Sequence, residues 1–184
     1  MKTLIINGSP RRNGDTSALL AELKKQLNGQ IMEVSAYYDK IAPCTDCRLC
    51  WKKKGCAIKD DMAKIYEDDF EVVVIASPLY MSNLTGPLVS LASRFQAYYA
   101  AKRFLKDAIN IRNKTAILIL VGGGDGGPEP AIQMAKWMFK KMNAELRDEN
   151  VVFSLHTDEL PAKEDLVAYL KIKEIACRIN QKYA

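Results

Sequence analysis

The chain has 184 residues, of which 48% are hydrophobic and 27% charged, and its formal net charge is +5. This length allows one domain with a sizeable core and is short for two. The apolar runs reach only about eight residues, whereas a membrane-spanning helix needs roughly twenty, and the first residues lack the pattern of a signal peptide. The charge suits anionic small molecules or an acidic protein better than nucleic acid, which needs a denser basic surface. We therefore expect a cytoplasmic protein that binds neither nucleic acid nor a membrane.

Short apolar runs alternate with amphipathic stretches along the chain. The runs predict strands at residues 4–6, 31–36, 70–76, 116–121 and 151–155. Apolar residues at helical spacing predict helices near residues 15–27, 60–66, 84–104, 128–142 and 163–182. Within the last two helices, Trp137 and Cys177 lie among apolar residues and are expected in the core. The alternation predicts an α/β fold, with a doubly wound parallel sheet in one domain spanning residues 1–184.

The loop after the first predicted strand has the composition of an anion-binding loop. Gly8 and Gly14 allow tight turns, and residues 15–17, Asp-Thr-Ser, are suitable caps for the helix that follows. A phosphate there would meet backbone N–H groups at the positive end of a helix dipole. The side chains available to it are those of Ser9, Arg11, Thr16 and Ser17. The alternative interpretation is an ordinary polar turn between a strand and a helix.

Two more loops of this kind follow the third and fourth predicted strands. Residues 77–83 read Ser-Pro-Leu-Tyr-Met-Ser-Asn, and residues 122–127 are rich in glycine. In a parallel sheet all such loops open at the carboxyl edge, where α/β proteins bind their ligands. Their convergence favours a ligand site over an ordinary turn.

Residues 8–16, 77–80 and 122–124 together resemble the flavin-contacting loops of the flavodoxin-like NAD(P)H-dependent FMN reductases. The resemblance covers nearly the whole chain, and it implies a five-stranded sheet of order 2-1-3-4-5. It also implies that FMN is bound, with NAD(P)H as a possible electron donor. The flavin itself carries out the redox chemistry in such proteins, so no catalytic side chain is expected.

The same resemblance implies which residues contact FMN. The first loop would contribute Ser9, Arg11, Asn13, Gly14, Asp15, Thr16 and Ser17, with the phosphate on Ser9, Arg11, Asn13, Thr16 and Ser17. The second loop would lie along the isoalloxazine ring with Pro78, Leu79, Tyr80, Met81, Ser82 and Asn83. The third would close over the far side of the ring with Gly122, Gly123, Gly124 and Asp125.

A cysteine-rich insert of about residues 37–60 follows the second predicted strand. Cys44, Cys47, Cys50 and Cys56 have the spacing CxxCxxCx5C, which can direct several thiolates at one iron–sulfur cubane. Zinc sites more usually combine two separated CxxC pairs. The run resembles that of the iron–sulfur flavoproteins, a branch of the same family, and implies that these four cysteines ligate a [4Fe–4S] cluster. The alternative is that they are free thiols.

These features predict an FMN-dependent oxidoreductase or electron-transfer flavoprotein. It would exchange electrons between a small acceptor and either a ferredoxin-type carrier or NAD(P)H, in a homodimer or homotetramer. Three alternatives remain. One is a cluster-free NAD(P)H:FMN or quinone reductase, and another is a flavodoxin-type carrier without a substrate of its own. A zinc-knuckle nucleic-acid binder is the third, although it leaves the three loops unexplained.

Overall fold

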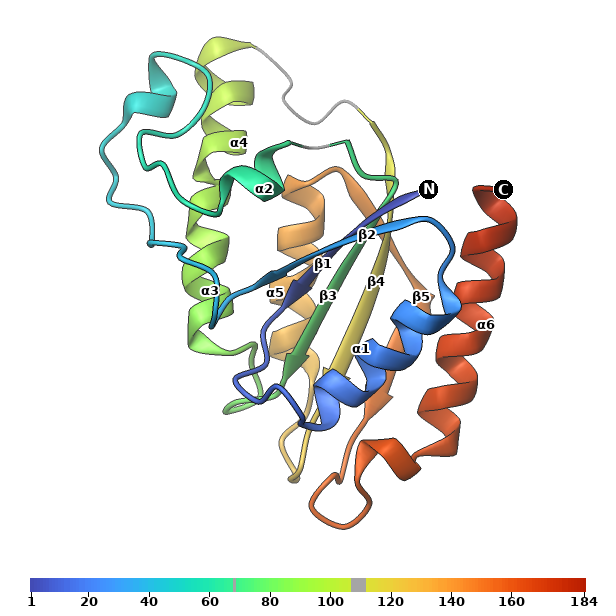
Figure 1. Cartoon of the computed structure of the whole chain (residues 1–184). Coiled ribbons are helices and arrows are strands. Elements are labelled where there is room, and N and C mark those ends of the chain that lie inside the picture. Colours follow the sequence, from blue (N-terminus) through green and yellow to red (C-terminus); the bar gives the residue numbers. More distant parts are fainter. Residues whose placement is uncertain (68, 107–111) are drawn as a thin grey trace.

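The computed structural model describes residues 1–67, 69–106 and 112–184. A five-stranded parallel sheet of order β2-β1-β3-β4-β5 forms its centre (Figure 1). The strands are β1 Lys2–Asn7, β2 Gln30–Ser35, β3 Val72–Pro78, β4 Lys114–Val121 and β5 Ala144–Ser154. Strands β1, β3 and β4 are almost entirely buried, as continuous apolar runs require when both faces of a sheet are covered. The predicted α/β fold and strand order are confirmed.

Helices cover both faces of this sheet. On one face lie α1 Asp15–Gln26 and α6 Leu166–Lys182, which pack on Ile5, Val74 and Ile119. The other face carries α2 Ala63–Tyr66, α3 Gly86–Ala92, α4 Gln96–Ala100 and α5 Glu129–Lys141. Alternate residues of each strand pack against the two helical layers, because successive side chains of a strand point to opposite faces. Throughout the described ranges, every helix is too short or too polar to cross a membrane.

The helical region predicted at residues 84–104 is divided in the structure. A 3-10 turn, Ser93–Phe95, separates α3 from α4, and a π-helical turn, Ala101–Leu105, follows α4. Strand β5 begins at Ala144, whereas the sequence predicted a start at Val151. The early part of β5 is largely exposed, and its register shifts between Ala116 and Leu118 of β4. An exposed edge strand with an irregular register lacks the apolar pattern that would predict it.

Two residues expected in the core lie at the surface. Trp137 of α5 is 41% exposed, and Cys177 of α6 is exposed as well. Helix α6 buries Ile175, Ala176 and Ile179 against the sheet. One further residue turns the side chain by about 100°, so Cys177 falls beside this stripe rather than within it.

The segment between β2 and α2, which the structure describes throughout, contains the cysteines and one 3-10 helix, Leu49–Trp51. It leaves the end of β2, passes outside α3 and runs back beside α4, away from the carboxyl edge of the sheet (Figure 1). The amide of Cys44 donates to Ser93 Oγ at 2.9 Å, which fixes the segment to the helical layer.

Candidate functional site

The loops after β1, β3, β4 and β5 line one cavity of about 280 Å³ at the carboxyl edge of the sheet. The predicted residues in its lining are Ser9, Arg11, Gly14, Asp15, Thr16, Pro78, Leu79, Tyr80 and Gly123. Other predicted residues belong to the same loops without lining this cavity: Asn13, Met81, Ser82, Asn83, Gly122, Gly124 and Asp125. Ser17 lines a neighbouring cavity. The three loops singled out from the sequence therefore meet at one place.

A fourth loop, which the sequence analysis missed, completes the cavity with Thr157 and Asp158. It follows β5, and the rule that loops after parallel strands meet at the carboxyl edge would have identified it. Its backbone is tied to the third loop, since the amide of Thr157 donates to the carbonyl of Gly122 at 2.9 Å.

The first loop is held by its own short polar side chains. Asn7 Oδ1 accepts a hydrogen bond from the amide of Ser9 at 2.9 Å. The amide of Arg11 donates to Ser9 Oγ at 3.2 Å, and Ser17 Oγ donates to the Arg11 carbonyl at 2.7 Å. These bonds fold residues 7–17 into a fixed turn whose arginines remain exposed.

Helix α1 begins at this loop without a side-chain cap. Its N-cap is Gly14, so the prediction that residues 15–17 cap the helix is wrong. Asp15 Oδ1 instead accepts from the amide of Ala162 at 2.9 Å, which joins the loop to the start of the last helical region. Because glycine has no side chain to accept from the first-turn amides of α1, an anion can fill that role. Thr16, which is the second residue of α1, is only 2% exposed.

The second loop turns sharply at its tip. Tyr80 and Asn83 exchange backbone hydrogen bonds of 2.9 and 3.0 Å, and the two residues between them have positive φ. Met81 has φ 50° and Ser82 φ 61°, which is the pattern of a type I′ turn. A left-handed methionine is sterically unfavourable, and this one is 99% exposed. The loop therefore presents a strained apolar tip beside the cavity, as functional sites often do.

Hydrogen bonds and close packing join the loops to one another. Thr85 Oγ1 donates to the Gly8 carbonyl at 2.9 Å, and the amide of Leu79 donates to the Val121 carbonyl at 2.7 Å. A Cβ atom on Gly122 would approach Leu79 Cδ1 to 3.2 Å, so the third loop packs closely on the second. These contacts hold the loops around the cavity in a fixed arrangement.

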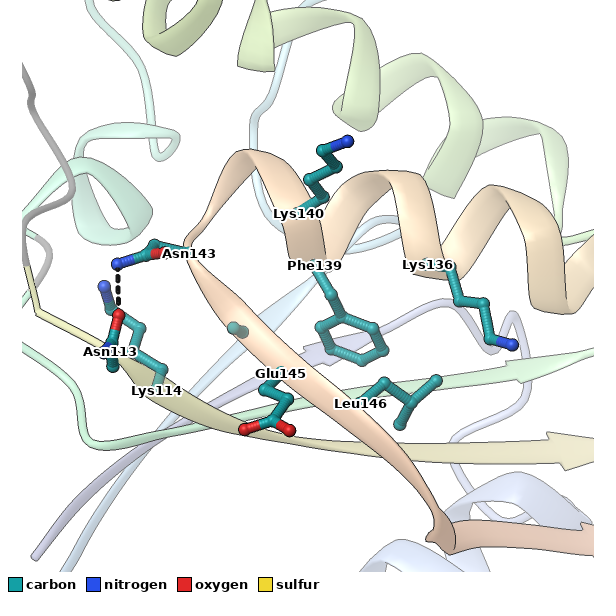
Figure 2. Close-up of a pocket in the computed structure, with 9 residues that line it drawn as sticks. Asn113, Lys114, Lys136, Phe139, Lys140, Asn143, Glu145 and Leu146 are labelled. Atoms are coloured by element: carbon teal, nitrogen blue, oxygen red, sulfur yellow. Dashed lines mark hydrogen bonds between the residues drawn. The ribbon is translucent and has the colours of Figure 1, made fainter.

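Two other cavities differ in their relation to this site. A cavity of about 500 Å³ adjoins the first loop, on the side of β2. There the Arg12 guanidinium lies 4.0 Å from the centre of the Tyr38 ring, and the Tyr38 hydroxyl donates to the Pro10 carbonyl. Figure 2 shows the other cavity, of about 350 Å³, at the amino ends of β4 and β5 beside α5. It is remote from the loops, and we assign it no part in ligand binding there.

The four cysteines line one small cavity, of about 20 Å³. Asp46 and Arg48, on either side of Cys47, have φ of 49° and 59°, and these left-handed residues turn the chain twice. Burial raises the pKa of Cys50, and the charges of the other three cysteines raise it further. The thiols are therefore close enough to interact electrostatically.

The thiols are not yet arranged as ligands. Within the described ranges, no group of three or more His, Cys, Asp or Glu side chains has the geometry to hold a metal ion. Cys47 is exposed, and the other three are half-buried. Thiolates repel one another, so cysteines generally take the geometry of ligands only when a metal compensates their charge. Four thiols around one cavity are a donor set that suits an iron–sulfur cluster.

A buried arginine, also missed in the sequence analysis, holds the cysteine segment in place. The Arg94 side chain is fully buried, and its Nη1 lies 2.7 Å from Asp60 Oδ2. Arg94 also donates to the carbonyls of Ala42 at 2.9 Å and Ile58 at 3.2 Å. These two residues precede and follow the cysteines, so one side chain fixes both ends. The only sequence signal was a charged residue within an apolar helical stretch.

Comparisons with known proteins agree with this architecture. The family model described as NADPH-dependent FMN reductase matches residues 1–157. An iron–sulfur flavoprotein of Archaeoglobus fulgidus is 37% identical over 134 residues, which cover 70% of this chain and 66% of that protein. One of Methanocaldococcus jannaschii is 36% identical over 139 residues, covering 72% and 68%. One of Methanosarcina thermophila is 28% identical over 186 residues, covering 97% and 93%.

Solved structures with low sequence identity share the fold. RosB with a bound flavin intermediate aligns with a TM-score of 0.74 and 16% identity, over 99% of this chain and 81% of that one. An FMN-dependent NADH-azoreductase from Bacillus anthracis, solved with FMN, aligns with a TM-score of 0.66 and 20% identity, over 98% and 100%. From the extent of the family match and these relatives, the chain belongs to the NADPH-dependent FMN reductase family of flavin oxidoreductases, in its iron–sulfur flavoprotein branch.

Proposed function

We propose that this chain is a flavoprotein oxidoreductase that holds FMN at the carboxyl edge of its sheet and a [4Fe–4S] cluster at its four clustered cysteines. It would exchange electrons between a reduced carrier or NAD(P)H and a small acceptor, as a single domain in the cytoplasm. The observation that carries this proposal is the presence of two separate cavities. Four loops line one, and Cys44, Cys47, Cys50 and Cys56 line the other.

The phosphate of FMN would lie at the amino end of α1. Ser9, Arg11 and Thr16 line the cavity there, and Asn13 and Ser17 belong to the same loop. Charge-assisted hydrogen bonds from a guanidinium and from helix amides suit a dianion. The second loop would lie along the isoalloxazine ring, and residues 122–125 would close over its far side. When bound, the flavin supplies the redox chemistry, and the protein supplies position and electrostatics.

The cluster would lie in the cysteine segment, between Arg94 and the exposed basic residues Arg48 and 52–54. Positive charge favours the reduced, more negative state of such a cluster and attracts an acidic carrier of the ferredoxin type. The segment runs away from the carboxyl edge of its own sheet (Figure 1). A second copy could bring its flavin closer than the chain's own, which favours a homodimer or homotetramer.

A cluster-free NAD(P)H:FMN or quinone reductase is the second candidate. The exposure of Cys47 and the lack of ready metal geometry in the described residues favour it. In that case the cysteines would be ordinary thiols, and a nicotinamide would deliver hydride directly to the flavin.

An anaerobic visible spectrum, with iron and acid-labile sulfide assays on the same sample, separates the two candidates. We expect flavin bands together with about four irons per chain, as four-cysteine ligation predicts. Flavin without iron, in protein never exposed to air, would favour the simple reductase. Failure to bind added FMN would contradict both.

The phosphate position has its own test. Riboflavin lacks the phosphate, so we expect FMN to bind at least about tenfold more tightly, the equivalent of one charge-assisted hydrogen bond. Arg11→Ala should narrow that ratio while leaving riboflavin affinity unchanged, as measured by quenching of flavin fluorescence. Equal affinities for the two flavins would place the phosphate elsewhere.

A further inference from the structure

Arg94, which lines the cysteine cavity, carries a buried hydrogen-bond donor that has no acceptor among the described residues. Arg94 lines this cavity with the four cysteines, and the residue is 1% exposed. Its Nη1 and Nη2 atoms are occupied by Asp60 and by the carbonyls of Ala42 and Ile58. Its Nε is buried and makes no hydrogen bond of normal geometry to a described residue, although the Tyr66 hydroxyl interacts with the same side chain. Buried donors of a charged group are almost always satisfied, so an acceptor is missing.

Four bonds fix the orientation of the guanidinium, so Nε cannot turn toward another acceptor without breaking them. Nearly all of the cavity lining beside Arg94 consists of the cysteine segment itself. Thiolate and sulfide sulfurs accept hydrogen bonds, and such bonds raise the reduction potential of a cluster. A second unpartnered donor, Trp51 Nε1, is also buried, but Trp51 does not line the cavity.

We propose that Arg94 donates its Nε–H to a sulfur of the group that the four cysteines hold, and that it raises the reduction potential of that group. This inference rests on the proposed function, because it requires a cluster at the cysteines. Arg94 then has two roles. Its Nη atoms fix both ends of the segment, and its Nε stabilises the added electron.

The chain offers a matched control on the same cavity. Arg48 also lines it, but its side chain is 61% exposed and pairs with Asp46 at 3.4 Å. Both Arg94→Lys and Arg48→Lys keep a positive charge and remove Nε–H. Only the first removes the buried donor. Asp60→Asn is the second control, because it keeps the Nε–H donor but weakens two of the four bonds that fix the guanidinium and the segment.

The first experiment measures midpoint potentials by electron paramagnetic resonance in anaerobically purified protein. Arg94→Lys should lower the potential by about 59 mV, a tenfold change in the one-electron equilibrium, as loss of one hydrogen bond to a charged acceptor implies. Arg48→Lys should shift it by much less, and Asp60→Asn, which removes a negative charge, should not lower it. Equal shifts in the two lysine variants, or an equal fall of the potential in Asp60→Asn, would overturn the proposal.

The second experiment uses wild-type protein, with Arg48→Lys as its only variant. Wild-type protein is produced in cells supplied with arginine that carries the heavy nitrogen isotope at Nε. The reduced cluster in this protein is then examined by pulsed electron paramagnetic resonance. We expect a nitrogen coupling that persists in Arg48→Lys. A wild-type cluster without this coupling would overturn the role of Arg94 and leave the proposed function intact. Wild-type protein without iron would overturn both.

Discussion

The two cavities are built in different ways. The loops at the carboxyl edge follow the strands of a parallel sheet. Backbone hydrogen bonds join them, such as that from the amide of Leu79 to the Val121 carbonyl. The cysteine segment has almost no regular structure, and it depends on side chains, chiefly the Arg94–Asp60 ion pair. One cavity is a product of the fold, while the other depends on one buried ion pair. We therefore expect that a substitution which disrupts one cavity leaves the other intact.

The largest effect should come from Arg94→Ala. It leaves the Asp60 carboxylate and the carbonyls of Ala42 and Ile58 without their partner, and breaking a buried ion pair typically costs about 3–5 kcal/mol of unfolding free energy. Urea unfolding monitored by circular dichroism measures this. Arg147→Ala removes an ion pair whose partners are more than half exposed, and it should cost less than about 1 kcal/mol. Similar losses in both variants would contradict a special role for Arg94.

Gly8→Ala should damage the flavin edge instead. A Cβ atom there would lie 2.7 Å from Leu88 Cδ2 and 3.2 Å from Ser77 Oγ, so the first loop or the buried Leu88 side chain of α3 must shift. We expect a loss of about 1–3 kcal/mol in stability and at least about tenfold weaker FMN binding. Gly86→Ala is the control, because a Cβ atom at Gly86 meets open space. If FMN titration gives the same affinity for Gly8→Ala and Gly86→Ala, close packing of the loops at the carboxyl edge is not required for FMN binding.

Acid should weaken the cysteine segment through Asp60. Burial alone would raise the pKa of this carboxyl, but hydrogen bonds from Arg94 and from the Ala42 and Met62 amides hold it below its usual 3.8. A lowered folded pKa gives stability that is complete above the unfolded value and is lost as pH falls through the folded one. Wild type should exceed Asp60→Asn by about 1.5 kcal/mol at neutral pH, and this advantage should shrink below about pH 4. A difference that is independent of pH in urea titrations would show that Asp60 is not the group responsible.

Met81→Gly should have the smallest effect on stability, and it should raise stability rather than lower it. Glycine adopts the positive φ of this turn without steric cost, so we expect a gain of up to about 1 kcal/mol in stability. Met81→Ala keeps the unfavourable backbone and should bring no gain. Thermal unfolding of both variants checks this, and equal gains would attribute the effect to the exposed apolar side chain instead.

The sequence predicted what depends on local pattern. Buried apolar runs predicted the strands, the family resemblance implied their order, and loops rich in Gly, Ser and Pro located the carboxyl-edge cavity. It did not predict interactions between distant residues. Arg94 and Asp60 are far apart in the chain, and Asp15 contacts Ala162 rather than capping its own helix. Such pairings arise from tertiary packing, and no periodicity of the sequence records them.

The most direct test compares cofactor content in wild type and Cys50→Ala, both purified without oxygen. Cys50 lines the cysteine cavity and lies outside the flavin cavity. We expect one FMN per chain in both proteins, about four irons in wild type and almost none in the variant, because one of four cluster ligands is gone. Wild-type protein without iron, or a variant that loses its flavin together with its iron, would contradict the proposal that the chain has two independent cofactor sites.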